Sequence, residues 1–233
     1  MYVSEVKLPQ GLLQITPGYS KKILLVAAGR EPLAKWLQSL DTEMTIYAVD
    51  KGMDYCLKAG ILPQALYGDK DSANEESWIK AHEAHVLCKE FLPEKDDTDL
   101  QLLLKDLPSA STVVATGIWS GRFDHLYANV FSLLAYKKEK KSVVILADEK
   151  EVLVIMTAGE RVIFTADNKP KVVSLLPLGE KNKVSIKGVK WPLEDSILEK
   201  QRPYAISNEL LEKEIEIQCS SGEVGLYFNF EGE

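Results

Sequence analysis

The sequence predicts an α/β protein in which an N-terminal doubly wound, mostly parallel sheet precedes a C-terminal antiparallel β-sandwich domain. Two patterns along the chain support this. From residue 21 to about residue 148, short apolar runs alternate with helical patterns, as in a parallel sheet covered by helices. After about residue 150, the apolar runs are separated by turn residues, which favours antiparallel strands.

The strands predicted in the first part are short, rich in Val, Ile and Leu, and hardly alternate between apolar and polar residues, as buried strands do. They cover residues 21–29, 45–50, 65–69, 85–91, 112–118 and 142–148. A helix is predicted after Thr98 because four leucines share one face of it. These are Leu100, Leu103, Leu104 and Leu107.

The strands predicted in the second part cover residues 151–159, 160–167, 171–179, 183–189, 214–219 and 224–232. A single short helix is expected near residues 209–213. We therefore divide the chain into an N-terminal extension (1–20), an α/β domain (21–149) and a β-sandwich domain (150–233). The extension lacks the basic segment and apolar core of a signal peptide, and the sequence assigns it no role.

Composition excludes several classes of function. The net charge of -7 and pI of about 5.2 argue against a nucleic-acid partner, because such proteins carry basic patches. No apolar run reaches the roughly 18 to 20 residues that a membrane span needs. The three cysteines are widely spaced, which indicates free thiols in a reducing compartment. The cytoplasm is the expected location.

Charged side chains gather where the predicted parallel strands end. Asp50 and Asp69 close two strands, and Asp71 follows two residues later. Two further clusters follow later strands: Lys95, Asp96, Asp97 and Asp99, then Arg122, Asp124 and His125. The carboxyl ends of such strands share one edge of the sheet, where ligands bind. Carboxylates crowded there repel one another unless a cation such as Mg²⁺ lies among them. With Lys95 and Arg122 as phosphate partners, the edge indicates phosphoryl-type transfer.

Simpler explanations stay open for each residue taken singly. An aspartate after a strand is more often a cap or a turn residue than a metal ligand. Ser72 with Glu75 and Thr98 with Gln101 have the spacing of capping boxes. Trp191 taken alone fits a core or interface position. What favours a ligand site is that the charged positions recur at the strand ends of one sheet.

Motifs in order along most of the chain resemble those of the thiamine pyrophosphokinase family, also called thiamin diphosphokinase. GDKDS (68–72) resembles the family's GDxDS, KDDTD (95–99) its KDxTD, and GIWSGRFDHLYAN (117–129) its GxxGGRxDHxxxN. SLLPL (174–178), IKGVKWPL (186–193) and ISN (206–208) resemble its C-terminal signatures. Each is weak alone, but six in this order are specific.

The resemblance implies that the thiamine hydroxyl attacks the β-phosphorus of ATP, giving thiamine diphosphate and AMP, with Mg²⁺ as cofactor. It also implies a homodimer with its active site at the subunit interface. Residues 21–149 would then bind nucleotide and Mg²⁺, and residues 150–233 would bind thiamine and form the dimer. Thiamine and ATP are the expected partners, without nucleic acid or membrane.

The family's functional residues are carried over to the matching positions of this sequence. The expected metal ligands are Asp69, Asp71 and Asp99. The expected catalytic residues are Asp71, Asp99, Arg122 and Asp124. The residues expected to bind ATP are Asp50, Lys95, Asp96, Thr98, Gly117 and Arg122. The expected thiamine contacts are Trp191, which would stack on the ligand, and the nearby polar pair Ser207 and Asn208.

Some positions depart from the family pattern. Lys51 and Ser120 stand where glycines are common, Lys70 stands where an apolar residue is usual, and Ala205 with Ile206 replaces Gly-Thr. These losses of glycine motivate a second hypothesis, a non-catalytic sensor of thiamine or nucleotide on the same fold. A third hypothesis, a carboxylate-rich phosphohydrolase, leaves the C-terminal motifs unexplained. The prediction is a Mg²⁺-dependent thiamine diphosphokinase.

Overall fold

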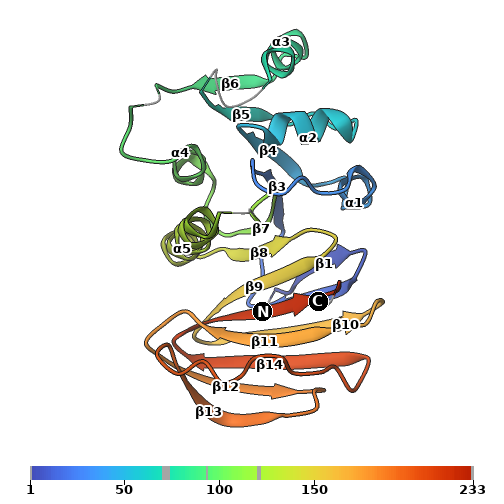
Figure 1. The fold of residues 1–233 in the computed structure, drawn as a ribbon, viewed down its shortest axis with the longest axis vertical. Coiled ribbons are helices and arrows are strands. Elements are labelled where there is room, and N and C mark those ends of the chain that lie inside the picture. The colour runs from blue at the N-terminus through green and yellow to red at the C-terminus, as the bar shows by residue number, and fades with distance from the viewer. Residues whose placement is uncertain (1, 70–73, 93, 120–121, 232–233) are drawn as a thin grey trace. The chain divides into compact units, whose positions relative to one another are not determined.

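The computed structural model describes residues 2–69, 74–92, 94–119 and 122–231. The chain forms two compact units, Lys21–Ser142 and a second unit that combines Met1–Ser20 with Val143–Glu233 (Figure 1). We call them the α/β unit and the β unit. The first twenty residues thus form part of the β unit. The second segment of that unit starts at Val143, whereas the change of sequence pattern suggests residue 150.

The sheet of the α/β unit consists of parallel strands in the order β7-β3-β4-β5-β6. Their bounds are β3 (Lys21–Val26), β4 (Thr45–Val49), β5 (Ala65–Gly68), β6 (Leu87–Glu90) and β7 (Ser111–Thr116). The chain adds β4, β5 and β6 on one side of β3 and then returns to add β7 on the other. This reversal makes a switch point at the carboxyl ends of β3 and β7, where doubly wound proteins bind ligands.

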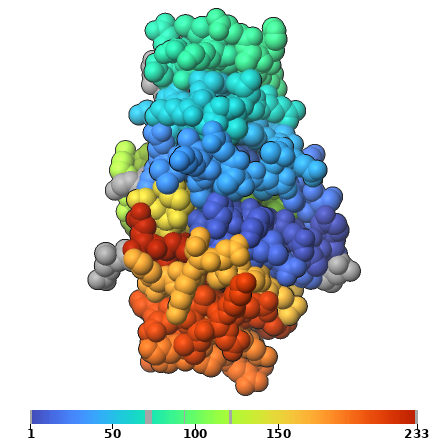
Figure 2. All heavy atoms as spheres, turned by 90° about the vertical axis from the view of Figure 1, so that its right-hand side faces the viewer, coloured from blue at the N-terminus to red at the C-terminus, as the bar shows by residue number. Residues whose placement is uncertain are grey.

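Helices cover both faces of this sheet (Figure 1). On one face, seen in Figure 2, lie α1 (Ala34–Gln38), α2 (Gly52–Lys58) and α3 (Glu75–Glu83). On the other face lie α4 (Asp99–Asp106) and α5 (Phe123–Lys140). Within the described ranges, no helix is long and apolar enough to cross a membrane.

Helix α4 matters for the site because it begins with one of the predicted acidic residues. Its start is fixed by the predicted capping box. Gln101 N–H donates to Thr98 Oγ1 at 3.2 Å, and Thr98 N–H donates to Gln101 Oε1 at 2.9 Å. The leucines of the predicted stripe are buried, so that prediction is confirmed. The other predicted box contains Ser72, which lies outside the described residues.

The far end of α4 is tied to the sheet by a polar cluster. Asp106 accepts hydrogen bonds from Tyr67 Oη at 2.9 Å and from Lys89 Nζ at 2.6 Å. The hydrogen bond from Lys89 holds the pKa of Asp106 below its ordinary value. Since Tyr67 lies on β5 and Lys89 on β6, the helix is anchored to two strands that end at the candidate site.

The β unit contains two antiparallel sheets. One has the order β1-β2-β10-β14-β12-β13, with β1 (Ser4–Leu8), β2 (Gly11–Thr16), β10 (Glu160–Ala166), β14 (Glu214–Ser221), β12 (Lys181–Lys187) and β13 (Leu193–Glu199). The other has the order β11-β15-β9-β8, with β11 (Val172–Pro177), β15 (Glu223–Asn229), β9 (Glu151–Thr157) and β8 (Val143–Ala147). Strand β8 belongs to this unit because it pairs antiparallel with β9.

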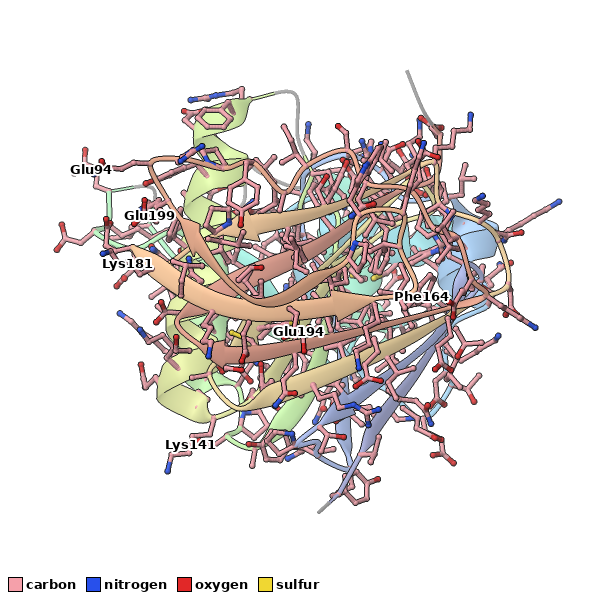
Figure 3. All side chains as sticks on the ribbon, turned by 90° about the horizontal axis from the view of Figure 1, so that it is seen from below. Glu94, Lys141, Phe164, Lys181, Glu194 and Glu199 are labelled. Atoms are coloured by element: carbon pink, nitrogen blue, oxygen red, sulfur yellow. The ribbon has the colours of Figure 1, made fainter. Side chains whose placement is uncertain are left out.

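The core of the β unit lies between the two sheets. Phe164 of β10 and Phe228 of β15 are fully buried, and their ring centroids are 4.6 Å apart. The outer side is charged: Lys181 and Glu199, at one end of the β12–β13 pair, reach out of the sheet next to each other (Figure 3). Apolar side chains between the sheets and charged ones outside make this a β-sandwich, as predicted.

Three parts of the β unit differ from the prediction. Strands β1 and β2 occupy the extension to which the sequence assigned no role. Strand β13 was not predicted, because it is an edge strand whose side chains are mostly exposed and polar. The short helix expected at 209–213 is wrong. Leu210 instead forms a bridge with Val189, and the backbone contact between Lys190 and Glu209 (2.9 Å) supports this extended course.

Candidate active site

The carboxyl ends of the parallel strands bring several predicted residues to one edge of the α/β unit. Asp50 follows β4, Asp69 follows β5 and Gly117 follows β7. Asp50 has a left-handed backbone with φ 51°, and its N–H donates to Tyr67 O at 2.9 Å. Aspartate tolerates this conformation better than most residues. It lets the chain leave β4 in a sharp turn into α2.

At the switch point, the backbones of β3 and β7 continue to touch beyond the strands. Ala27 N–H donates to Thr116 O at 2.8 Å, and Gly29 N–H donates to Gly117 O at 2.6 Å. Gly117 has φ +64°, and a Cβ on it would lie 2.1 Å from Ala27 O. There is no room for a side chain here. The backbone itself therefore forms this part of the edge, as expected for a residue that admits close approach.

Lys95 and Asp99 form an ion pair at the start of α4. Lys95 Nζ lies 2.9 Å from Asp99 Oδ1, and the two side chains are only 18% and 11% exposed. Their neighbours behave differently. Asp96 is exposed, and Asp97 pairs with Lys105 at 2.6 Å. A shielded lysine next to a shielded carboxylate is suited to binding a phosphate and a cation side by side.

The donor atoms at this edge fit Mg²⁺. Asp69 and Asp99 each have a carboxylate oxygen that is buried from solvent, and Mg²⁺ prefers such hard oxygens, one or two from the protein and the rest from water and phosphate. The third predicted ligand, Asp71, lies outside the described residues. Among the residues that the structure does describe, no group of three or more His, Cys, Asp or Glu side chains is arranged to hold a metal.

Arg122 and Asp124 make a two-pronged contact at the start of α5. Arg122 Nη2 donates to Asp124 Oδ2 at 2.6 Å and Nε donates to Oδ1 at 3.2 Å. The two side chains are 70% and 63% exposed. The hydrogen bonds from Arg122 hold the pKa of Asp124 below its ordinary value and raise the pKa of Arg122. Both groups are therefore charged at neutral pH, and both are accessible to a ligand.

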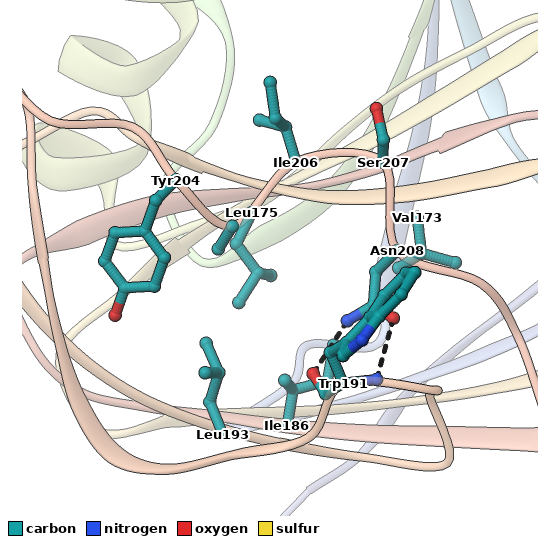
Figure 4. Close-up of a pocket in the computed structure, with 10 residues that line it drawn as sticks. Val173, Leu175, Ile186, Trp191, Leu193, Tyr204, Ile206, Ser207 and Asn208 are labelled. Atoms are coloured by element: carbon teal, nitrogen blue, oxygen red, sulfur yellow. Dashed lines mark hydrogen bonds between the residues drawn. The ribbon is translucent and has the colours of Figure 1, made fainter.

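The β unit contains a pocket of about 400 Å³ (Figure 4). Its floor is apolar, since Val173, Leu175 and Ile186 are buried. Its rim carries Trp191, which is 53% exposed, and Tyr204, which is 50% exposed. An apolar floor with aromatic rings at the rim suits a small, planar heterocycle.

All three residues predicted to contact thiamine line this pocket: Trp191, Ser207 and Asn208. Ser207 has a left-handed backbone with φ 59°, and its N–H donates to Ser174 Oγ at 3.0 Å. The Lys190 ammonium lies 4.6 Å from the centre of the Trp191 ring. Sequence reasoning missed Tyr204, which also lines the pocket, because an exposed aromatic in a loop has no local pattern that marks it.

Two family models match this chain. One, described as thiamin pyrophosphokinase, catalytic domain, matches residues 36–145. The other, described as thiamin pyrophosphokinase, vitamin B1 binding domain, matches residues 161–224. Most of the first match falls in the α/β unit, and the whole of the second falls in the β unit.

Relatives agree with the family models. Thiamine pyrophosphokinase of Bacillus subtilis (strain 168) is 33% identical over 196 residues, which cover 82% of this chain and 90% of that protein. A crystal structure of thiamine pyrophosphokinase from Bacillus subtilis matches 91% of this chain and 100% of its own, with 26% identity and a TM-score of 0.78. One from Geobacillus thermodenitrificans matches 90% and 97%, with 26% identity and a TM-score of 0.74. These matches confirm the predicted fold class, and the chain belongs to the thiamin pyrophosphokinase family.

Proposed function

We propose that this chain is a thiamine diphosphokinase, which transfers the diphosphate of Mg²⁺-bound ATP to the hydroxyl of thiamine and releases AMP. The observation that supports this most is the pocket of the β unit. It is lined by Trp191, Ser207 and Asn208, the residues that the sequence motifs assign to thiamine. The pocket also falls in the part of the chain that matches the vitamin B1 binding model.

ATP and Mg²⁺ are proposed to bind at the carboxyl edge of the α/β unit. Asp69 and Asp99 hold the ion together with Asp71, which lies outside the described residues. Bound there, Mg²⁺ neutralises phosphate charge and so lowers the barrier to attack by a nucleophile. Without ligands, Lys95 and Asp99 neutralise each other. With Mg²⁺ and ATP present, Lys95 turns to phosphate and Asp99 to the ion, so neither charge is left unpaired.

The remaining residues predicted for ATP lie around the same strand ends. They are Asp50, Asp96, Thr98 and Gly117. Gly117 offers backbone with no side chain in the way. Thr98 is already used as the cap of α4, so its proposed contribution to ATP binding is to fix the start of the helix that presents Asp99.

In the transfer step, the thiamine hydroxyl oxygen bonds to the β-phosphorus, the bond from that phosphorus to the oxygen of AMP breaks, and the hydroxyl proton is released to water. Arg122 is proposed to bind the charge that develops on the transferred group, since a guanidinium matches phosphate oxygens with two parallel N–H groups. Asp124 orients the attacking hydroxyl by accepting its hydrogen bond.

A product assay tests the proposal. The protein incubated with thiamine, ATP and Mg²⁺ is expected to give equal amounts of thiamine diphosphate and AMP. Asp99→Asn should lower turnover by about 100-fold, because it removes a charged ligand of the ion. Asp97→Asn is the matched control. It changes a carboxylate two positions away that pairs with Lys105, and turnover should be unchanged.

Other products would contradict the assignment. Release of inorganic phosphate without AMP, with or without thiamine, would indicate a phosphohydrolase. Tight binding of thiamine or ATP with no AMP at all would indicate a sensor.

We also propose a cytoplasmic homodimer in which each active site combines residues of two subunits. The support is the family resemblance. At a thiamine concentration near the wild-type KM, Arg122→Ala and Trp191→Ala should each be nearly inactive alone, but mixing the two should restore activity. A mixed dimer would have one site with both residues intact and one with neither. No recovery on mixing, together with a fully active monomer in sedimentation, would refute the shared site.

A further inference from the structure

The side-chain amide of Asn208 is occupied by backbone groups at the pocket rim (Figure 4). Its Oδ1 accepts hydrogen bonds from Trp191 N–H at 3.1 Å and from Glu209 N–H at 2.9 Å. Its Nδ2 donates to Trp191 O at 2.8 Å. An amide oxygen has two lone pairs, so Oδ1 has none left for a ligand. Turning the amide over would set NH₂ against N–H, so its orientation is determined.

The backbone of Asn208 is fixed to the pocket floor. Asn208 and Val173 of β11 exchange two backbone hydrogen bonds, at 2.8 and 2.9 Å. Beside them, Ser174 Oγ accepts from Ser207 N–H, and Leu175 N–H donates to Ala205 O at 2.8 Å. Asn208 therefore connects a buried strand on one side to the backbone of Trp191 on the other.

Trp191 depends on this connection, because it lies in the segment between β12 and β13 and its side chain is largely exposed. One face of the ring is near the Lys190 ammonium, and Lys190 is itself paired with Glu209 at 2.8 Å. An exposed ring on a connecting segment keeps one position only if its backbone is held. Two of the three hydrogen bonds of the Asn208 amide do this.

We propose that Asn208 is a positioning residue, which sets the Trp191 ring for stacking on the substrate and acts on binding through that ring. The inference rests on the proposed function, because thiamine is the ligand that the pocket is expected to take. It assigns to Asn208 a different role from the direct polar contact that the family motif implies. Ser174, the first residue of the SLLPL motif, holds the same loop by accepting the hydrogen bond from Ser207 N–H.

A double-mutant cycle separates the two roles. The dissociation constant for thiamine is measured by isothermal titration calorimetry for the wild type, Asn208→Ala, Trp191→Ala and the double variant. We expect Asn208→Ala to weaken binding about 10-fold in the wild-type background and to have almost no effect once Trp191 is absent. The KM for thiamine should rise with kcat little changed. An equal loss in both backgrounds would mean that Asn208 contacts the ligand itself, and the proposal would be refuted.

A second measurement needs no thiamine. The other tryptophans, Trp36, Trp78 and Trp119, are buried, so collisional quenching of fluorescence by acrylamide reports mainly on Trp191. Quenching should increase in Asn208→Ala and change less in Asn208→Asp, which keeps the acceptor oxygen. Asn168→Ala is the control, since Asn168 bridges to Pro9 O at 3.1 Å in the same unit but away from the pocket. It should leave quenching unchanged.

The calorimetry and the quenching measurement distinguish failure of the proposed function from failure of the positioning role. If the wild type does not bind thiamine, the proposed function is wrong and the quenching arm alone judges the positioning role. Equal quenching of the wild type and Asn208→Ala would then overturn it.

Discussion

Replacing Gly117 with alanine is expected to lower the free energy of unfolding by about 3 kcal/mol or more. Two costs add at this position. A residue with a Cβ pays about 1 to 2 kcal/mol for the left-handed backbone that Gly117 adopts. The new Cβ would also lie 2.1 Å from Ala27 O, a backbone atom that cannot rotate away. Urea denaturation followed by circular dichroism measures the change.

Gly60→Ala is the matched control in the same unit. Gly60 has φ +68°, close to that of Gly117, but no atom of the described residues lies within 4 Å of an added Cβ. The free energy of unfolding of Gly60→Ala should fall only by the cost of the left-handed backbone, about 1 kcal/mol. The difference between the two variants then measures the overlap at the switch point. Equal losses would mean that the ends of β3 and β7 can separate without cost.

Replacing Arg122 with alanine is expected to reduce kcat by about 10³-fold and to leave the melting temperature nearly unchanged. The stability should hardly change, because the ion pair with Asp124 is largely exposed and such pairs add little. Turnover should fall, because the guanidinium meets the charge of the transferred diphosphate. Rates of AMP release and thermal unfolding, measured on the same preparation, check both parts.

Two further variants sharpen this test. Arg122→Lys keeps the charge but loses the two-pronged geometry, so its kcat should lie between those of the wild type and the alanine variant. Arg161 makes an exposed ion pair with Glu216 through Nε alone, at 2.8 Å, between β10 and β14, so Arg161→Ala should keep a normal kcat. A normal kcat in Arg122→Ala would remove this residue from the reaction.

The fold was predictable for strands that are buried on both faces. Strand β8 exposes none of its side chains, and its sequence VVILA is a continuous apolar run that needs little context to interpret. The hairpin β1–β2 has only one buried face, and five or six alternating residues are too few to distinguish a strand from a loop. Strand β2 pairs with β10, which lies far along the chain, so no local sequence pattern predicts this pairing.

The candidate site was predictable as a set of charges but not as a set of contacts. Strand ends and motifs indicated Lys95 and Asp99 separately, and only the structure pairs them. The contact between Asn208 and Trp191 joins residues 17 apart in the sequence. It depends on which way an amide is turned, which spacing does not encode. A motif match therefore names Asn208 as important without saying through which neighbour it acts.

The β unit is made from both ends of the chain, with the α/β unit inserted between them. During synthesis, the complete α/β unit leaves the ribosome before β10 exists, and domains tend to fold as they emerge. Strand β2 pairs with β10 along one edge. Until β10 is synthesised, that edge of β2 has no partner strand. Removing the first twenty residues would in turn leave β10 with an open edge, and open edges invite aggregation. Expression designs for this protein should therefore keep its start.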